Sequence, residues 1–89
     1  MEVDLRIEGA RSLKDKRQVV KHLVEGARRR FAVSAAEVDR QDVWQRAVLG
    51  FAVVTSSARL ADEVMDDIDR FVWSHPEVEV LSAERVWLA

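Results

Sequence analysis

The sequence predicts an α+β fold in which a four-stranded antiparallel sheet carries two helices on one face. Three observations predict it: two segments with helical apolar periodicity, four short apolar segments typical of strands, and their order along the chain, β-α-β-β-α-β. Two right-handed β-α-β crossovers then place the first and third strands in the middle of the sheet. We therefore predict a ferredoxin-like sandwich formed by a single domain, residues 1–89.

Four segments are expected to form the strands. Residues 2–9 alternate apolar and charged side chains, as a half-buried strand does. Residues 32–39 are small and tolerate β-structure, which favours an edge strand. Residues 44–56 are apolar on both faces, which favours a central strand. Residues 77–88 alternate again and form the last strand.

The first helix is expected over about residues 13–30. Ser12 lies three residues before Asp15, which is the [ST]-x-x-[DE] pattern of a helix start. Gly26 lies inside this helix and is expected to mark a close contact, because glycine costs about 1 kcal/mol relative to alanine there. The expected core face of the helix is Leu13, Val20, Val24, Ala27 and Phe31.

The second helix is expected over about residues 58–74. Ser56 or Ser57 caps its start, and Pro76 ends it because proline disfavours helical backbone at the residue before it. Its expected core face is Leu60, Val64, Ile68 and Phe71, with Ala61 and Val72 beside them.

Composition limits the chemistry that this chain of 89 residues can perform. Without cysteine it has no disulfide, thiol nucleophile or cysteine metal site. No signal peptide is visible, and the apolar runs are far shorter than the ~20 residues of a membrane span, so we expect a cytoplasmic protein. His22, expected on the outer side of the first helix, and His75 have no second ligand at metal spacing. We expect no metal and no cofactor.

Positive charge is concentrated in one segment, although the net charge is −2. Residues 11–30 hold eight of the fourteen Lys and Arg residues: Arg11, Lys14, Lys16, Arg17, Lys21, Arg28, Arg29 and Arg30. On a helical wheel Lys14, Arg17, Lys21 and Arg28 follow one flank of the apolar face, a geometry that suits a phosphate backbone. The candidate anion- or RNA-binding residues are therefore Arg11, Lys14, Arg17 and Lys21.

A structural explanation of the same cations stays open. The second helix has a net charge of −3 over residues 58–74, so the two helices would attract each other if they lay side by side. Arg28 to Arg30 also suit the negative end of the first helix dipole. The segment before the first helix, residues 9–12, offers backbone amides to an anion. A small-anion hydrolase there would need an asparagine to place its water, and the chain has none, so we expect no enzyme.

The uncovered sheet face is a second candidate surface. With Leu49, Phe51 and Val53 assigned to the core, it carries Trp44, Arg46, Val48, Gly50 and Ala52, which do not form the aromatic stacking platform of an RNA recognition motif. Small apolar side chains on an open sheet favour self-association, and the candidate interface residues are Trp44, Arg46, Val48 and Trp87. An ordinary mixed surface is the alternative. Trp73 is expected at a rim or over one end of the core.

Four segments, "ARSLKDKRQVVKHL", "RRRFAVSAAEV", "DVWQRAVLGFAVV" and "VEVLSAERVWL", resemble the YlxP-like family of small uncharacterised bacterial proteins. The resemblance covers nearly the whole chain. It includes Ser12, Leu13, Lys14, Lys16 and Arg17, then Arg30, Phe31, Val33, Ser34 and Glu37, and Trp44 to Ala47. It implies a ferredoxin-like fold and, because members are often encoded beside translation and ribosome-maturation factors, a role near RNA or the ribosome. It implies no catalytic residue.

Two hypotheses follow from these observations. In the first, the chain is a non-catalytic binding protein that contacts structured RNA or a ribosomal particle through phosphates. In the second, it is a protein-interaction module, a homodimer formed through the open sheet face, without a nucleic-acid role. The partner's identity is not encoded in any motif that we find.

Overall fold

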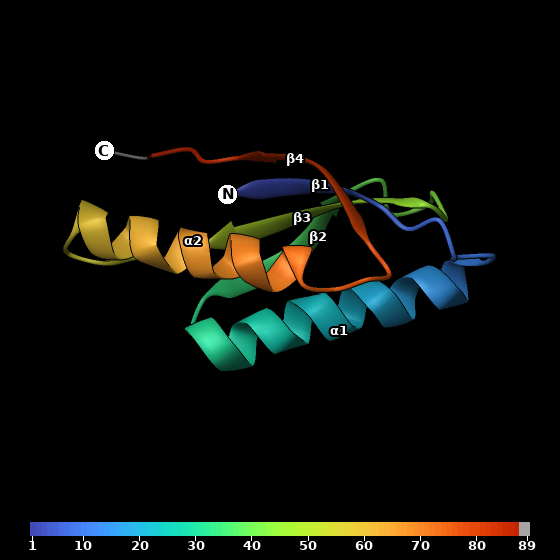
Figure 1. Cartoon of the computed structure of the whole chain (residues 1–89), viewed down its shortest axis with the longest axis horizontal. Coiled ribbons are helices and arrows are strands. Elements are labelled where there is room, and N and C mark those ends of the chain that lie inside the picture. The colour runs from blue at the N-terminus through green and yellow to red at the C-terminus, as the bar shows by residue number, and fades with distance from the viewer. Residues whose placement is uncertain (88–89) are drawn as a thin grey trace.

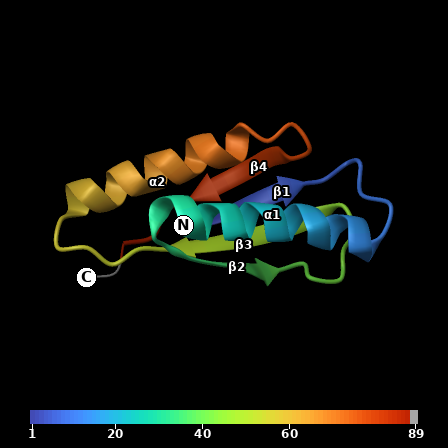
Figure 2. The same ribbon diagram turned by 90° about the horizontal axis from the view of Figure 1, so that it is seen from below.

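The sheet has the order β2-β3-β1-β4, and every neighbouring pair of strands is antiparallel. The computed structural model describes residues 1–87. Its elements are β1 (Glu2–Arg6), α1 (Leu13–Phe31), β2 (Ser34–Asp39), β3 (Arg46–Ala52), α2 (Ala58–Trp73) and β4 (Glu79–Glu84). Both helices cover the same face of the sheet, α1 in front of the β2 side and α2 alongside β4 (Figures 1 and 2). The predicted ferredoxin-like α+β sandwich is confirmed.

The core lies between the sheet and the two helices. Val3 and Leu5 of β1 are fully buried and pair with Leu49 and Ala47 of β3. Phe51 is also buried, and Val53 packs against the core from a partly buried position. The opposite face of the sheet has no covering element among the described residues. The expected division of β3 between core and open face is therefore confirmed.

Both edge strands carry a bulge. Between Glu37 and Asp39 the register of β2 shifts, so that Val38 is the extra residue opposite β3. On β4 the shift makes Leu81 the extra residue opposite β1. Bulges on edge strands hinder the addition of another strand along the edge. The strands are also shorter than expected, since β3 begins at Arg46; position 88 of the last expected strand lies outside the described residues.

Local side-chain contacts set the starts of both helices. The Ser12 hydroxyl accepts a hydrogen bond from the Asp15 N–H (3.1 Å), and the Ser57 hydroxyl accepts one from the Leu60 N–H (3.3 Å). These are N-cap bonds, which satisfy amides that a helix leaves unpaired. Ser57 rather than Ser56 is thus the second cap. α1 ends at Phe31, and its C-cap Ala32 adopts a left-handed conformation with φ 51°.

Glycine at position 26 permits the two helices to approach closely. A Cβ atom built there would lie 2.7 Å from Phe71 Cζ, which is closer than any ordinary contact. The expected close contact at Gly26 is confirmed, and it fixes which side of α1 faces α2.

Some helix positions differ from the expected core faces. Leu60 is 43% exposed because it lies in the first turn of α2, beyond the core. Leu23 and Met65 are buried although the expected faces omitted them. Trp73 ends α2 and is 61% exposed, so it does not cover the end of the core. Within residues 1–87, neither helix is long and apolar enough to span a membrane.

Candidate functional site

The contacts of α1 show which way its cationic flank faces. Gly26 lies against Phe71 of α2, whereas Arg28 Nη2 donates a hydrogen bond to the Ala35 carbonyl of β2 (2.6 Å). At ~100° per residue, Gly26 and Arg28 lie on opposite flanks of the helix. One flank of α1 therefore faces α2, and the other lies beside the edge strand β2.

The predicted RNA-binding residues lie on the β2 side. Lys14, Arg17 and Lys21 share the flank of Arg28, and each is exposed. Arg11 is exposed and comes just before the N-cap Ser12. With 1.5 Å of rise per residue, the three helical cations span about 10 Å. We call these four residues, Arg11, Lys14, Arg17 and Lys21, the cationic stripe.

The side chains of the stripe form no ion pair among the described residues. Six of the fourteen Lys and Arg residues form ion pairs: Arg6, Lys16, Arg46, Arg59, Arg70 and Arg85. Of these six, Lys16 alone comes from the cation-rich segment 11–30. The structure therefore satisfies most cations elsewhere in the fold with carboxylates and leaves the stripe exposed to solvent.

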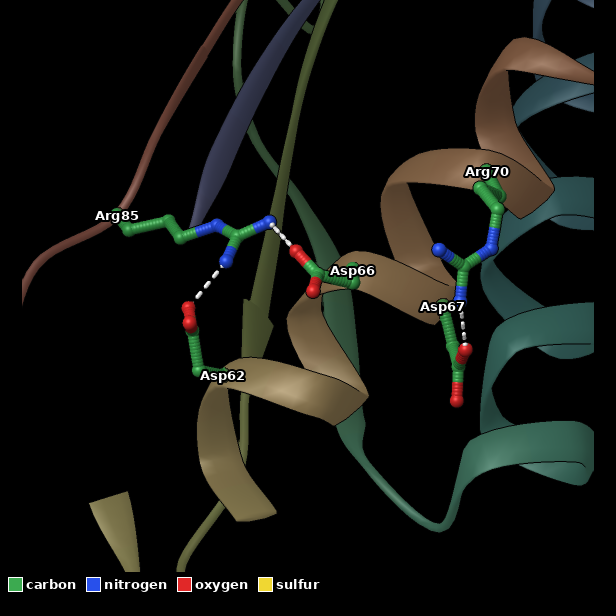
Figure 3. Close-up of polar contacts among 5 residues, drawn as sticks. All are labelled: Asp62, Asp66, Asp67, Arg70 and Arg85. Atoms are coloured by element: carbon green, nitrogen blue, oxygen red, sulfur yellow. Dashed lines mark hydrogen bonds and ion pairs between the residues drawn. The ribbon is translucent and has the colours of Figure 1, made fainter. Parts of the chain in front are cut away.

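The expected attraction between α1 and the acidic α2 is not realised as ion pairs in residues 1–87. Arg85, which follows β4, instead binds Asp62 and Asp66 of α2, and Asp67 binds Arg70 within the helix (Figure 3). The hydrogen bond to Asp66, reinforced by Asp62, raises the pKa of the Arg85 guanidinium despite some loss of its hydration. The acids of α2 are thus engaged by residues other than those of the stripe.

The cations at the end of α1 have structural roles, as expected. Arg28 binds the Ala35 carbonyl, and Arg30 lies over the rings of Phe31 (5.5 Å) and Phe71 (5.1 Å). All three arginines from 28 to 30 also occupy the last turn, where a cation complements the helix dipole. These residues therefore need no external partner to explain them.

Lys16 is a structural residue that the charge pattern concealed. Its side chain is completely buried, with Nζ 2.7 Å from Glu37 Oε2 and in hydrogen-bonding contact with the Arg40 carbonyl. The carboxylate contact is close but poorly directed for a hydrogen bond, so we treat it as an ion pair. A helical wheel could have identified it, because Lys16 lies between Val20 and Leu13 on the core face.

The loop before α1 does not form an anion site. The Asp15 carboxylate accepts the Arg11 N–H (3.0 Å), so the helix provides its own anion for that amide. Glu8, Asp15 and Glu77 line a shallow depression beside the loop and would repel a further anion. Gln45 fixes the loop by donating to the carbonyls of Glu8 and Ala10 (both 3.3 Å).

The predicted interface residues do not form one patch. On the open sheet face Arg46 Nη2 donates to both carboxylate oxygens of Asp4 (3.0 and 2.9 Å). Val48 lies on the same face, half-buried. Trp44 precedes β3 at one end of the sheet, whereas Trp87 follows β4 at the other end. Both tryptophans are more than half exposed. Arg46 and Val48 remain together, while the tryptophans are separated by the length of the sheet.

Comparison with known proteins identifies the family. The family model described as "Protein of unknown function (DUF503)" matches residues 1–85. The "Uncharacterized protein YlxP" of Bacillus subtilis is 35% identical over 86 residues, which cover 97% of this chain and 94% of that protein. The chain belongs to the YlxP-like DUF503 family. This agrees with the resemblance carried by the sequence segments.

The histidines of this DUF503 protein are closer than their sequence positions suggested. His22 does not lie opposite the apolar face, because its ring centroid is 5.4 Å from that of His75 across the α1–α2 seam. His75 Nδ1 contacts the Phe71 carbonyl (2.7 Å). Among the described residues, no three His, Cys, Asp or Glu side chains gather as metal ligands would. The candidate site that remains is the cationic stripe, which is suited to binding anions.

Proposed function

We propose that this protein is a non-catalytic, cytoplasmic RNA-binding protein that contacts structured RNA or a ribosomal particle through phosphates. The observation that carries the proposal is the cationic stripe, which has four exposed cations and no ion pair within residues 1–87. The genomic context implied by the resemblance to the YlxP-like family agrees with this proposal.

The position of the stripe is unfavourable for the helix itself. Lys14 lies in the first turn of α1 and Arg11 just before it, at the positive end of the helix dipole. A cation there costs a few tenths of a kcal/mol, up to about 1 kcal/mol, whereas an acid would stabilise the helix. Helix stability therefore does not account for Lys14, and this supports a role for Lys14 in binding an external anion.

The neighbouring side chains favour backbone contacts over base contacts. Single-stranded RNA is held largely by aromatic side chains that stack on bases. The stripe contains no aromatic residue, and Trp44, Trp73 and Trp87 lie on other elements. A row of cations on a helix instead suits the phosphates of a folded RNA.

The test is binding of the protein to ribosomal RNA, measured by fluorescence anisotropy over a range of salt concentrations. The test variant changes Lys14 and Arg17 to Glu. The matched control changes Arg59 and Arg70 to Glu, since these are exposed arginines on α2. We expect the affinity to fall steeply with salt and the test variant to lower the salt slope by about 2, with little change in the control. Absence of binding at low salt, or equal loss in both variants, would refute the proposal.

The open sheet face supports a second candidate function, that of a homodimeric interaction module. Val48 and Ala52 present small apolar side chains there, on either side of Gly50, which has none. The bulges at Val38 and Leu81 disfavour pairing through the sheet edges. Self-association would therefore occur face to face. Sedimentation equilibrium of the wild type and of Val48→Lys tests it, and a monomer at high concentration would contradict it.

A further inference from the structure

His22 and His75 lie together although they are far apart in the sequence. His22 is one turn before Gly26 on the flank of α1 that faces α2, and His75 comes directly after the C-cap of α2. Their ring centroids are 5.4 Å apart, and the ring planes are inclined by 69°. His22 is exposed and His75 is partly exposed, so solvent reaches both rings. Two imidazoles from different elements thus meet at the surface of the α1–α2 seam.

The orientation of His75 is fixed by the last turn of α2. His75 Nδ1 is 2.7 Å from the Phe71 carbonyl oxygen, which can only accept, so Nδ1 carries the proton and donates it. In the neutral ring the lone pair is therefore on Nε2. The Phe71 ring also packs against the His75 ring, with centroids 4.6 Å apart. A carbonyl that accepts from one imidazole nitrogen and leaves the other free is typical of histidines that bind metal ions.

The spacing of the two rings suits a metal ion between them. An imidazole nitrogen binds Zn²⁺ at about 2.1 Å, which places the centre of its ring about 3.2 Å from the ion. At the tetrahedral angle, two such ring centres are about 5.2 Å apart. The observed separation is 5.4 Å. The exposed His22 ring can turn about its side-chain bonds, so one nitrogen of each ring can reach a common ion without a shift of the helices.

Three carboxylates lie beside the histidine pair. They line the depression next to the loop before α1 and are Glu8, Asp15 and Glu77. The same depression is lined by Val19, one turn before His22, and by Pro76, directly after His75. Within residues 1–87 no three His, Cys, Asp or Glu side chains converge as metal ligands do, so the carboxylates act through their charge. They attract cations to the pair, and the imidazoles select a transition metal over Mg²⁺ or Ca²⁺, which prefer oxygen.

We propose that His22 and His75 together bind one divalent transition-metal ion of the class of Zn²⁺, Ni²⁺ or Cu²⁺, with water in the remaining positions. Two protein ligands make an exchangeable site, whereas a permanent structural zinc site has four. Because one ligand belongs to α1 and the other follows α2, the ion joins the two helices and stabilises the folded state. The cationic stripe lies on the other flank of α1, so the metal site does not depend on the proposed RNA binding.

The first test is thermal denaturation in a chelator-free buffer at about pH 7.5, where free histidine is mainly neutral. We expect ZnCl₂ at about 1 mM to raise the Tm by about 5 °C or more, and the same concentration of MgCl₂ to change it little. His22→Gln and His75→Gln should each abolish the increase. Each variant is compared with itself without metal, so a change in its basal stability does not affect the result.

The matched control combines His22→Gln with Gln41→His. It keeps two histidines in the chain but places one of them on the exposed turn between β2 and β3, away from His75. We expect ZnCl₂ to leave its Tm unchanged. An increase as large as that of the wild type would show that the position of the histidines is immaterial, and would overturn the inference.

The second test locates the ion by NMR of the ¹³C-labelled protein during addition of ZnCl₂. We expect the imidazole signals of His22 and His75 to shift together and to reach saturation at one ion per chain. The inference is overturned if the Tm does not rise, if either single variant keeps the increase, or if one histidine alone responds. An equal effect of MgCl₂ would show that the carboxylates alone hold the cation. An effect that grows with protein concentration would show His22 bridging two copies, and either result also overturns the inference.

Discussion

Lys16 and Glu37 form an ion pair between α1 and β2, with Nζ 2.7 Å from Oε2 and the lysine side chain completely buried. The same ammonium contacts the carbonyl of Arg40, which adopts a left-handed conformation with φ 62°. A single cation thus joins the helix, the edge strand and the turn that follows it. Both residues belong to the segments that resemble the YlxP-like family, and this contact gives them a structural role.

The first prediction concerns the pair itself. Lys16→Met leaves Glu37 largely buried without its cation, and we expect a loss of about 3–5 kcal/mol in the free energy of unfolding. Lys16→Met combined with Glu37→Met should recover much of this loss, because two apolar side chains replace two buried charges. Urea denaturation of the two single variants and the double variant measures the coupling. Additive losses would show that the two residues do not interact.

The second prediction concerns the contact between α1 and α2. Gly26→Ala should gain up to about 1 kcal/mol in helix propensity. The new Cβ would nevertheless lie 2.7 Å from Phe71 Cζ, and the Phe71 ring is held by edge contacts with Phe31 and His75. We expect a net loss of about 1–3 kcal/mol from overpacking.

Phe71→Leu provides the control for Gly26→Ala. The shorter side chain removes the atom that the new methyl group would meet, so the alanine should cost less in the Phe71→Leu background than in the wild type. A thermal denaturation series of the four proteins measures this. An increase in Tm for Gly26→Ala alone would contradict the close approach of the helices.

The fold was predictable because its signals are local and repeated. The alternation around Val3 and Leu5 and the doubly apolar β3 give the strand order, and Ser12 with Asp15 gives the start of α1. Strand ends were less predictable, because they depend on pairing partners: β3 begins at Arg46, where β1 ends opposite it. The helical spacing assigned Leu60 to the core. The side chain is instead exposed, because the first turn of α2 lies beyond the core.

The candidate site was predictable as a list of cations but not as a division between structural and exposed ones. Lys16 and Arg17 are adjacent and chemically alike, yet the first is buried against Glu37 and the second is exposed. Which flank of α1 faces α2 depends on the tertiary contact of Gly26.

The third prediction separates the stripe from folding. Lys14→Glu places an acid in the first turn of α1 and removes an unfavourable cation, so we expect unchanged or higher stability, by up to about 1 kcal/mol. Arg17→Glu should change stability by less than about 0.5 kcal/mol, because its side chain is exposed and has no ion pair in residues 1–87. Thermal denaturation at low salt measures the stability of both variants. A large loss in either variant would mean that the stripe stabilises the fold.

The last prediction concerns Arg85, which ties the chain after β4 to α2 through Asp62 and Asp66. Arg85→Gln should cost about 1 kcal/mol, since both carboxylates are about half exposed and solvent screens the pairs. Arg59→Gln, which breaks an exposed pair within one helix, is the control and should cost about 0.3–0.5 kcal/mol.

The pH dependence of the Arg85 contribution follows from the direction of its pKa shift. Because folding raises the pKa of Arg85, the stabilisation of the folded state by Arg85 is present below the ordinary arginine pKa and is lost only as the pH rises through the still higher folded value. The difference between Arg85→Gln and the wild type should therefore be the same at about pH 7 and about pH 9 and smaller in high salt, as urea denaturation can measure. A difference that grows with salt would exclude ion pairing as its cause.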